Sequence, residues 1–101
     1  MKVTTVLYIL AVASSAAAEA CHPGLTYCGE SLLTKGNYHE QINEALEREG
    51  IPTDSHHVLD SLFFCTDDED YVVFKATCKP DRCQDAGLGN SDYCIGDPEE
   101  Q

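Results

Sequence analysis

The chain has 101 residues, and its 18 acidic side chains against six basic ones give a formal net charge of −12. This length fits one small domain, and the acidic excess disfavours nucleic-acid binding, because phosphates are bound by basic patches. It also disfavours electrostatic attraction to anionic membranes, so the simplest role of the charge is solubility.

The first 20 residues have the pattern of a secretory signal peptide. Met1 and Lys2 form a short basic start, an apolar run covers residues 3–12, and small residues lead to cleavage before Glu19 or before Cys21. The apolar run is shorter than the roughly 20 residues that a membrane-spanning helix needs, so no membrane span is expected. Removal of both Lys2 and Glu19 takes away one charge of each sign and leaves the net charge at −12.

An exported chain of this size predicts a single cysteine-rich domain over residues 21–94, followed by an acidic flexible tail over residues 95–101. Such a small domain buries too little apolar surface to be comfortably stable, and each disulfide adds about 2–4 kcal/mol. An even number of cysteines predicts three disulfides rather than a zinc site, although their pairing stays open. The six cysteines are Cys21, Cys28, Cys65, Cys78, Cys83 and Cys94.

The first elements of this domain are a short strand and a helix. We expect the strand over residues 26–28, with a turn at Gly29. The helix is predicted over residues 38–49, because apolar side chains recur on one face of it, and this face is expected to cover a sheet. The apolar residues are Tyr38, Ile42, Ala45 and Leu46.

Both ends of this helix carry typical capping residues. Asn37 is the predicted N-cap, and Glu40 is placed to return a hydrogen bond to the cap's own N–H. Gly50 fits the left-handed position after the last turn, and Pro52 prevents the helix from continuing. Residues 53–57 are expected to form a polar link to the next strand.

The central element is a β-hairpin over residues 59–78. Aromatic and branched residues flank a polar connector over residues 66–70, and its four acids repel one another and keep the tip in solvent. Cys65 and Cys78 could bridge each other only if the register brings their Cα atoms to about 4.4–6.8 Å. In the second strand, alternation predicts one shared face for Val72, Phe74, Ala76 and Cys78.

The last third of the domain is loop-rich. Residues 79–87 could hold one helical turn, with Pro80 at its start and Gly87 at its end, or they could form a bridged loop. A short edge strand is expected at Tyr93 and Cys94. The predicted fold is therefore α+β, a small disulfide-stabilised two-layer domain with one main helix packed on an antiparallel sheet built around the hairpin.

Short motifs spread over nearly the whole chain after Cys21 form a pattern of spacing. They are Tyr27-Cys28-Gly29, Leu32-Leu33, Gly36-Asn37-Tyr38, His57-Val58, Ser61-Leu62-Phe63, Cys65, Cys83, Gly87 and Ser91-Asp92-Tyr93-Cys94. This pattern resembles a family of small secreted cysteine-rich proteins of filamentous fungi, many of which are candidate effectors, although glycine at Asp85-Ala86 would match it better. The resemblance implies secretion into the host's extracellular space, and the small α/β sandwich of killer toxins of the KP-six type.

Two candidate metal sites are disfavoured. His56 and His57 stand between Asp54 and Asp60, but adjacent residues in extended chain point to opposite faces, so the two rings would not share one ion. The acidic run over residues 67–70 lacks the glycine and glutamate spacing of an EF-hand loop. We therefore expect surface histidines, a solvated hairpin tip, and no bound metal or cofactor.

No motif predicts catalysis. There is no G-x-S-x-G nucleophile, bridged cysteines cannot act as nucleophiles, and Gly87-Leu88-Gly89-Asn90 is too short for a phosphate-binding loop. We expect a non-enzymatic monomer that binds a host protein or glycan through its loops. The alternative is a secreted toxin that antagonises competing microbes through a protein target.

The candidate interaction surface consists of the hairpin tip and the loop before the last cysteine. Its residues are Asp67, Asp68, Glu69, Asp70, Gly87, Leu88, Gly89, Asn90, Ser91, Asp92 and Tyr93. Protonation of all four histidines between neutrality and pH 5 would change the net charge from −12 to −8. Solubility and partner binding are therefore expected to change modestly over this range.

Overall fold

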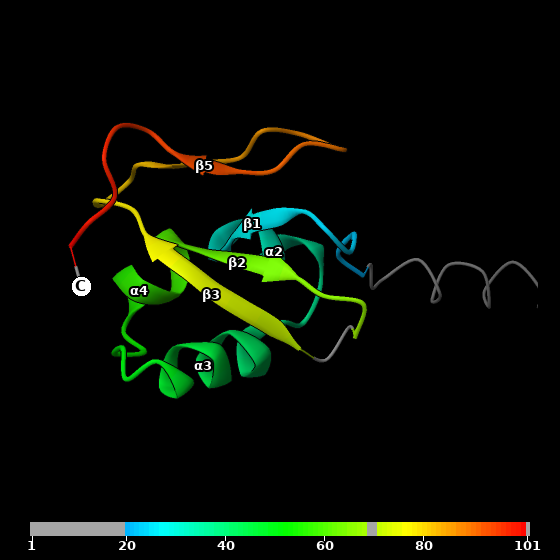
Figure 1. Ribbon diagram of the computed structural model, residues 1–101, viewed down its shortest axis with the longest axis horizontal. Coiled ribbons are helices and arrows are strands. Elements are labelled where there is room, and N and C mark those ends of the chain that lie inside the picture. The colour runs from blue at the N-terminus through cyan, green and yellow to red at the C-terminus, as the bar shows by residue number, and fades with distance from the viewer. Residues whose placement is uncertain (1–19, 69–70, 101) are drawn as a thin grey trace, which may run out of the picture.

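The computed structural model describes residues 20–68 and 71–100, and in these ranges the chain forms three helices and five strands (Figure 1). All but the last residue of the predicted signal peptide, together with Glu69, Asp70 and Gln101, lies outside the described residues. In chain order the elements are β1 (Thr26–Cys28), α2 (Gly29–Lys35), α3 (His39–Arg48), α4 (Ser55–Asp60), β2 (Ser61–Cys65), β3 (Val72–Thr77), β4 (Cys83–Gln84) and β5 (Tyr93–Cys94).

The predicted hairpin is confirmed as β2 and β3, the centre and one edge of an antiparallel sheet with the order β1-β2-β3. Tyr27 of β1 lies opposite Phe63 of β2, which in turn lies opposite Phe74 of β3. The Phe63 and Phe74 rings make an edge-to-face contact with centroids 6.2 Å apart. This pairing places two aromatic side chains side by side on the face that the helices cover.

A β-bulge in β3 changes which residues face the core. Phe63 pairs with Phe74 but Leu62 pairs with Ala76, so Lys75 is an extra residue in β3. Because one inserted residue reverses the alternation, the prediction that Ala76 shares a face with Phe74 is wrong. Thr77 is the fully buried residue instead, and its hydroxyl lies 2.8 Å from that of Ser61.

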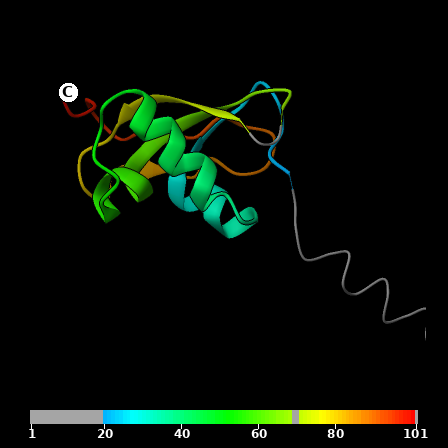
Figure 2. The same cartoon turned by 90° about the horizontal axis from the view of Figure 1, so that it is seen from below.

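The three helices gather on one side of this sheet (Figure 2). The α+β class is confirmed, although the single main helix of the prediction is one of three, with α3 the longest. The apolar face predicted for α3 is confirmed in full, since all four residues are buried. The core between helices and sheet consists of Tyr27, Leu32, Tyr38, Ile42, Ala45, Leu46, Val58, Phe63 and Val72 with Cys21 and Cys65.

The start of α3 differs from the predicted capping box. The helix begins at His39 with Tyr38 at the N-cap position, and no side chain in the described residues caps it. Tyr38 is instead fixed by a residue 17 positions earlier in the chain, because its hydroxyl accepts a hydrogen bond of 2.8 Å from the Cys21 N–H. At the other end Gly50 has φ +70°, which confirms the predicted left-handed position.

Two predicted connections are helical. Gly29, predicted to form a turn, is the first residue of α2, where it packs directly against the backbone of α4. The segment predicted to link into the hairpin forms the first half of α4, which is capped by Asp54, whose side chain accepts from the His57 N–H. The first strand of the hairpin therefore begins at Ser61 and not at Leu59.

Three disulfides use all six cysteines, as predicted. Cys65 lies opposite Val72 and not Cys78, so the two hairpin cysteines do not bridge each other. The bridges are Cys21–Cys65, Cys28–Cys83 and Cys78–Cys94.

The last part of the chain forms a two-stranded ribbon, which we call the C-terminal ribbon and which consists of β4, β5 and the loop between them. Cys83 pairs with Cys94, which confirms the edge strand and favours the bridged loop over the helical turn. The ribbon lies beside β1 (Figure 1).

Two residues of the segment predicted to be a flexible tail are hydrogen-bonded to the rest of the domain. The Ile95 N–H donates to the Arg82 carbonyl and the Glu99 N–H donates to the Thr77 carbonyl, both at 2.7 Å. Within residues 20–68 and 71–100, no helix has the length and apolar character needed to cross a membrane.

Candidate functional site

A groove of about 520 Å³ lies between α2 and the C-terminal ribbon. Its volume is within the range of about 300–1,000 Å³ that is usual for binding pockets. Glu30, Thr34 and Lys35 line it from α2, and the other wall includes Asp85 and Leu88 of the ribbon. The groove therefore combines charged groups of both signs with apolar surface.

One disulfide and one carboxylate hold the two walls together. The Cys28–Cys83 bridge joins the start of α2 to β4. Asp92 accepts hydrogen bonds from the Cys28 N–H at 2.9 Å and from the Ala86 N–H at 2.8 Å. A buried carboxylate needs such donors, and Asp92 is only 5% exposed.

Asp92 is therefore a buried residue that supports the groove and also lines it, and its part in the predicted interaction surface stays a prediction. Its neighbour Ser91 is exposed, but its hydroxyl accepts from the Thr26 N–H at 3.0 Å. The Asp92 N–H also donates to the Thr26 carbonyl at 2.8 Å. Residues 91–92 thus satisfy backbone groups on the free edge of β1.

The tip of the ribbon presents one apolar side chain to solvent. Leu88 is 87% exposed and lies between Gly87 and Gly89, which have φ of +90° and +81°. A positive φ suits glycine, and the tight loop is closed by a hydrogen bond of 3.2 Å from the Asn90 N–H to the Gly87 carbonyl. The ribbon therefore holds Leu88 at the rim of the groove, and Tyr93 is also exposed.

None of the described residues of the hairpin tip lines this groove. Asp67 and Asp68 are exposed, as predicted, and the Thr66 hydroxyl accepts from the Asp68 N–H at 3.2 Å. Glu69 and Asp70, the other two predicted tip residues, lie outside the described residues. The predicted interaction surface thus divides into the ribbon at the groove and a separate acidic tip.

Comparison of this chain with protein-family models, with curated proteins and with solved structures finds no match.

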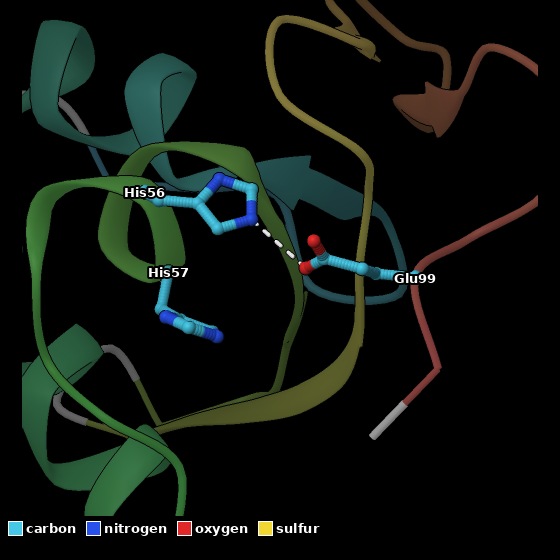
Figure 3. Close-up of side chains that lie close together, drawn as sticks. All are labelled: His56, His57 and Glu99. Atoms are coloured by element: carbon cyan, nitrogen blue, oxygen red, sulfur yellow. Dashed lines mark hydrogen bonds and ion pairs between the residues drawn. The ribbon is translucent and has the colours of Figure 1, made fainter.

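A second cluster of polar side chains lies at α4, where His56 and His57 meet Glu99 of the C-terminal segment (Figure 3). The two imidazole rings have centroids 5.0 Å apart and are tilted by 58°. The prediction that these rings point to opposite faces is wrong, because the segment is helical and not extended. No local pattern pointed to Glu99, which is 43 residues from His56.

Carboxylates hold both rings in place. His56 Nδ1 lies 2.9 Å from Asp60 and His56 Nε2 lies 2.8 Å from Glu99, while His57 Nδ1 lies 2.5 Å from Asp54. The hydrogen bonds to Glu99 and then to Asp60 raise the pKa of His56 above its ordinary value. The hydrogen bond with the His57 side chain lowers the pKa of the Asp54 carboxyl.

Proposed function

We propose that this protein is a secreted, non-enzymatic binding protein that recognises a partner protein through the groove between α2 and the C-terminal ribbon. The observation that carries the proposal is the groove, with the exposed Leu88 held at its rim. An apolar side chain in such a place suits an anchor that a partner covers. Three disulfides in so small a domain are typical of extracellular proteins, and they support secretion.

Charge supports a partner with a basic surface. The chain carries a net charge of −12, and Glu30 and Asp85 contribute carboxylates to opposite walls of the groove. Complementary charge speeds association and orients the two surfaces. Binding that uses it weakens as salt is added, because exposed charges are screened over about 8 Å at physiological ionic strength.

The resemblance to fungal secreted cysteine-rich proteins supports an effector role in the extracellular space of a plant host. In that role the disulfides would protect the domain from proteolysis, and the C-terminal ribbon would supply specificity for the partner. The killer-toxin-like sandwich implied by the same resemblance remains part of this proposal.

Affinity capture from plant extracellular fluid tests the proposal, with the oxidised protein as bait. We expect the wild type to retain a defined protein that is released by salt and lost with Leu88→Asp. The matched control is Ile95→Asp, which changes an exposed apolar side chain outside the groove and should retain the partner. Both substitutions are at exposed positions, so the fold should be unaffected.

Three results would contradict this function. Capture that is the same with Leu88→Asp would place binding elsewhere on the surface. Retention of glycans on an array, with no protein captured, would replace the protein partner by a carbohydrate. Inhibition of microbial growth, without an effect in plant tissue, would favour the toxin alternative.

A further inference from the structure

We propose that His56, His57 and Glu99 form a zinc site that fastens the C-terminal segment to α4. This inference concerns the α4 end of the molecule and does not depend on the proposed function of the groove. Two imidazole nitrogens and one carboxylate oxygen are a ligand set that Zn²⁺ uses, with a water molecule completing the tetrahedron.

The ligand atoms of the three residues are already separated by distances close to those in a zinc site. One ligand atom from each residue lies within 4.8 Å of the other two, and His56 Nε2 is 2.8 Å from Glu99. Around a tetrahedral Zn²⁺ with bonds of about 2.0–2.2 Å, neighbouring ligand atoms are about 3.3–3.5 Å apart. Ligand atoms that are now up to 4.8 Å apart would therefore approach by about 1 Å, and the Glu99 oxygen would move slightly away from His56 Nε2.

The carboxylates behind the two rings strengthen the assignment. Asp60 binds His56 at Nδ1 and Asp54 binds His57 at Nδ1, so Nε2 of each ring is the candidate ligand atom, and at His56 the ion would replace the hydrogen bond between Nε2 and Glu99. Metal-bound histidines commonly donate their other N–H to a carboxylate, which fixes the tautomer and makes the ring a better ligand. Here both histidines have this support, and Figure 3 shows both rings on the side of α4 that faces Glu99.

Charge and burial also favour a cation. With neutral imidazoles, the carboxylates of Asp54, Asp60 and Glu99 give the cluster three negative charges, and a divalent ion offsets two of them. The side chains of His56, His57 and Glu99 are 25%, 19% and 35% exposed. An ion can therefore enter from solvent, yet its ligands are partly shielded from competing water.

Glu99 is also positioned by its backbone. Its N–H donates to the Thr77 carbonyl at the end of β3, so its carboxylate is presented to α4 from a fixed point. In the bound state the ion links α4 to the C-terminal segment, which continues from the C-terminal ribbon.

The test is titration of the oxidised, chelator-treated protein with Zn²⁺ by calorimetry at neutral pH. We expect one ion per chain, with binding lost in His57→Gln and in Glu99→Gln. His39→Gln is the matched control, because it removes an exposed histidine on α3, and it should bind as the wild type does. Asp54→Asn and Asp60→Asn should each weaken binding by about 10–100-fold.

Two further measurements report the coordination geometry of the ion and its effect on the C-terminal segment. Co²⁺ in place of Zn²⁺ should give the visible spectrum of a tetrahedral site in the wild type and not in His57→Gln. Addition of Zn²⁺ should slow hydrogen exchange of the Glu99 amide. Circular dichroism and disulfide mapping of each variant would separate loss of the site from loss of the fold.

Some outcomes would overturn the proposal. Weak binding that is equal in the wild type and in His57→Gln would mean an adventitious ion only. Equal binding of Ca²⁺ would mean a general acidic patch without nitrogen ligands. Tight zinc binding without protection of the Glu99 amide would exclude the fastening of the C-terminal segment.

Discussion

Gly29 lies where the first turn of α2 touches the backbone of α4. A Cβ atom at this position would be 1.7 Å from the Val58 carbonyl oxygen, which is far inside van der Waals contact. We predict that Gly29→Ala destabilises the domain by about 1–3 kcal/mol or more, because the two helices must separate.

Urea unfolding of the oxidised protein measures this loss. The control is Thr34→Ala on the same helix, which changes an exposed residue and should alter stability by less than about 0.5 kcal/mol. A Gly29→Ala protein as stable as the wild type would show that the helices do not pack as closely as described.

His56 links folding stability to pH. Its pKa is raised in the folded protein, first by Glu99 and then by Asp60. Its contribution is therefore fully present below the unfolded pKa of about 6.5 and is lost as the pH rises through the folded value. In the metal-free protein we predict that the free energy of unfolding falls over this window in the wild type and falls less in His56→Gln.

Urea unfolding at several pH values with a chelator present measures this difference between the wild type and His56→Gln.

Asp54 links folding stability to pH in the acidic range, since its pKa is lowered in the folded protein. Its contribution is present above the unfolded pKa of about 3.9 and is lost as the pH falls through the folded value. Parallel pH profiles for the wild type and His56→Gln near neutrality would exclude the linkage at His56.

At the scale of elements, β2 and β3 are joined by a buried pair of hydroxyls. Ser61 and Thr77 are both fully buried, and their side-chain oxygens lie 2.8 Å apart. We predict that Ser61→Ala and Thr77→Val each cost about 1–3 kcal/mol, because the remaining hydroxyl is left without its partner. The double variant should cost less than the sum, because it leaves neither hydroxyl behind.

A double-mutant cycle in urea measures the coupling between these two positions. Strictly additive losses would mean that the two hydroxyls do not interact. The bulge at Lys75 creates this pair, because it places Thr77 opposite Ser61 on the buried face.

The elements were predictable wherever the pattern is local. The apolar face of α3, the two runs of the hairpin and the left-handed Gly50 follow from residues a few positions apart. The start of α3 and the bulge in β3 were not predictable in this way. The first depends on the distant contact between Tyr38 and Cys21, and the second on how the core packs across the sheet.

At the scale of the whole molecule, the disulfides differ in the length of chain that they close. Cys28–Cys83 spans 55 residues and Cys78–Cys94 spans 16. Because closure entropy grows with loop length, we predict that Cys28→Ala with Cys83→Ala costs about 4 kcal/mol, and Cys78→Ala with Cys94→Ala about 3 kcal/mol.

Thermal and urea unfolding of the two double variants measures which of them loses more stability. Only loss of Cys28–Cys83 should also open the groove, because this bridge joins its two walls. A reversed order of stability would mean that native-state contacts outweigh the entropy of the unfolded chain.

In the candidate sites, too, the features set by neighbouring residues were predictable and those set by contacts between distant residues were not. The ribbon loop was predictable as an exposed surface from its glycines and polar residues. The buried role of Asp92 was not, because its hydrogen-bond donor at Cys28 is 64 residues away. The histidine cluster was missed because α4 was expected to be extended and because Glu99 belongs to a segment expected to be free.

The sequence by itself determined the class of this protein: a small acidic chain with six cysteines, one strongly amphipathic helix and a hairpin. Composition and short-range periodicity carry that information, since they report which residues avoid water. Only the tertiary structure decided the disulfide pairing, the groove beside Leu88 and the meeting of His56, His57 and Glu99. These features join segments far apart in the chain, and their positions depend on how the helices and the ribbon pack around one sheet.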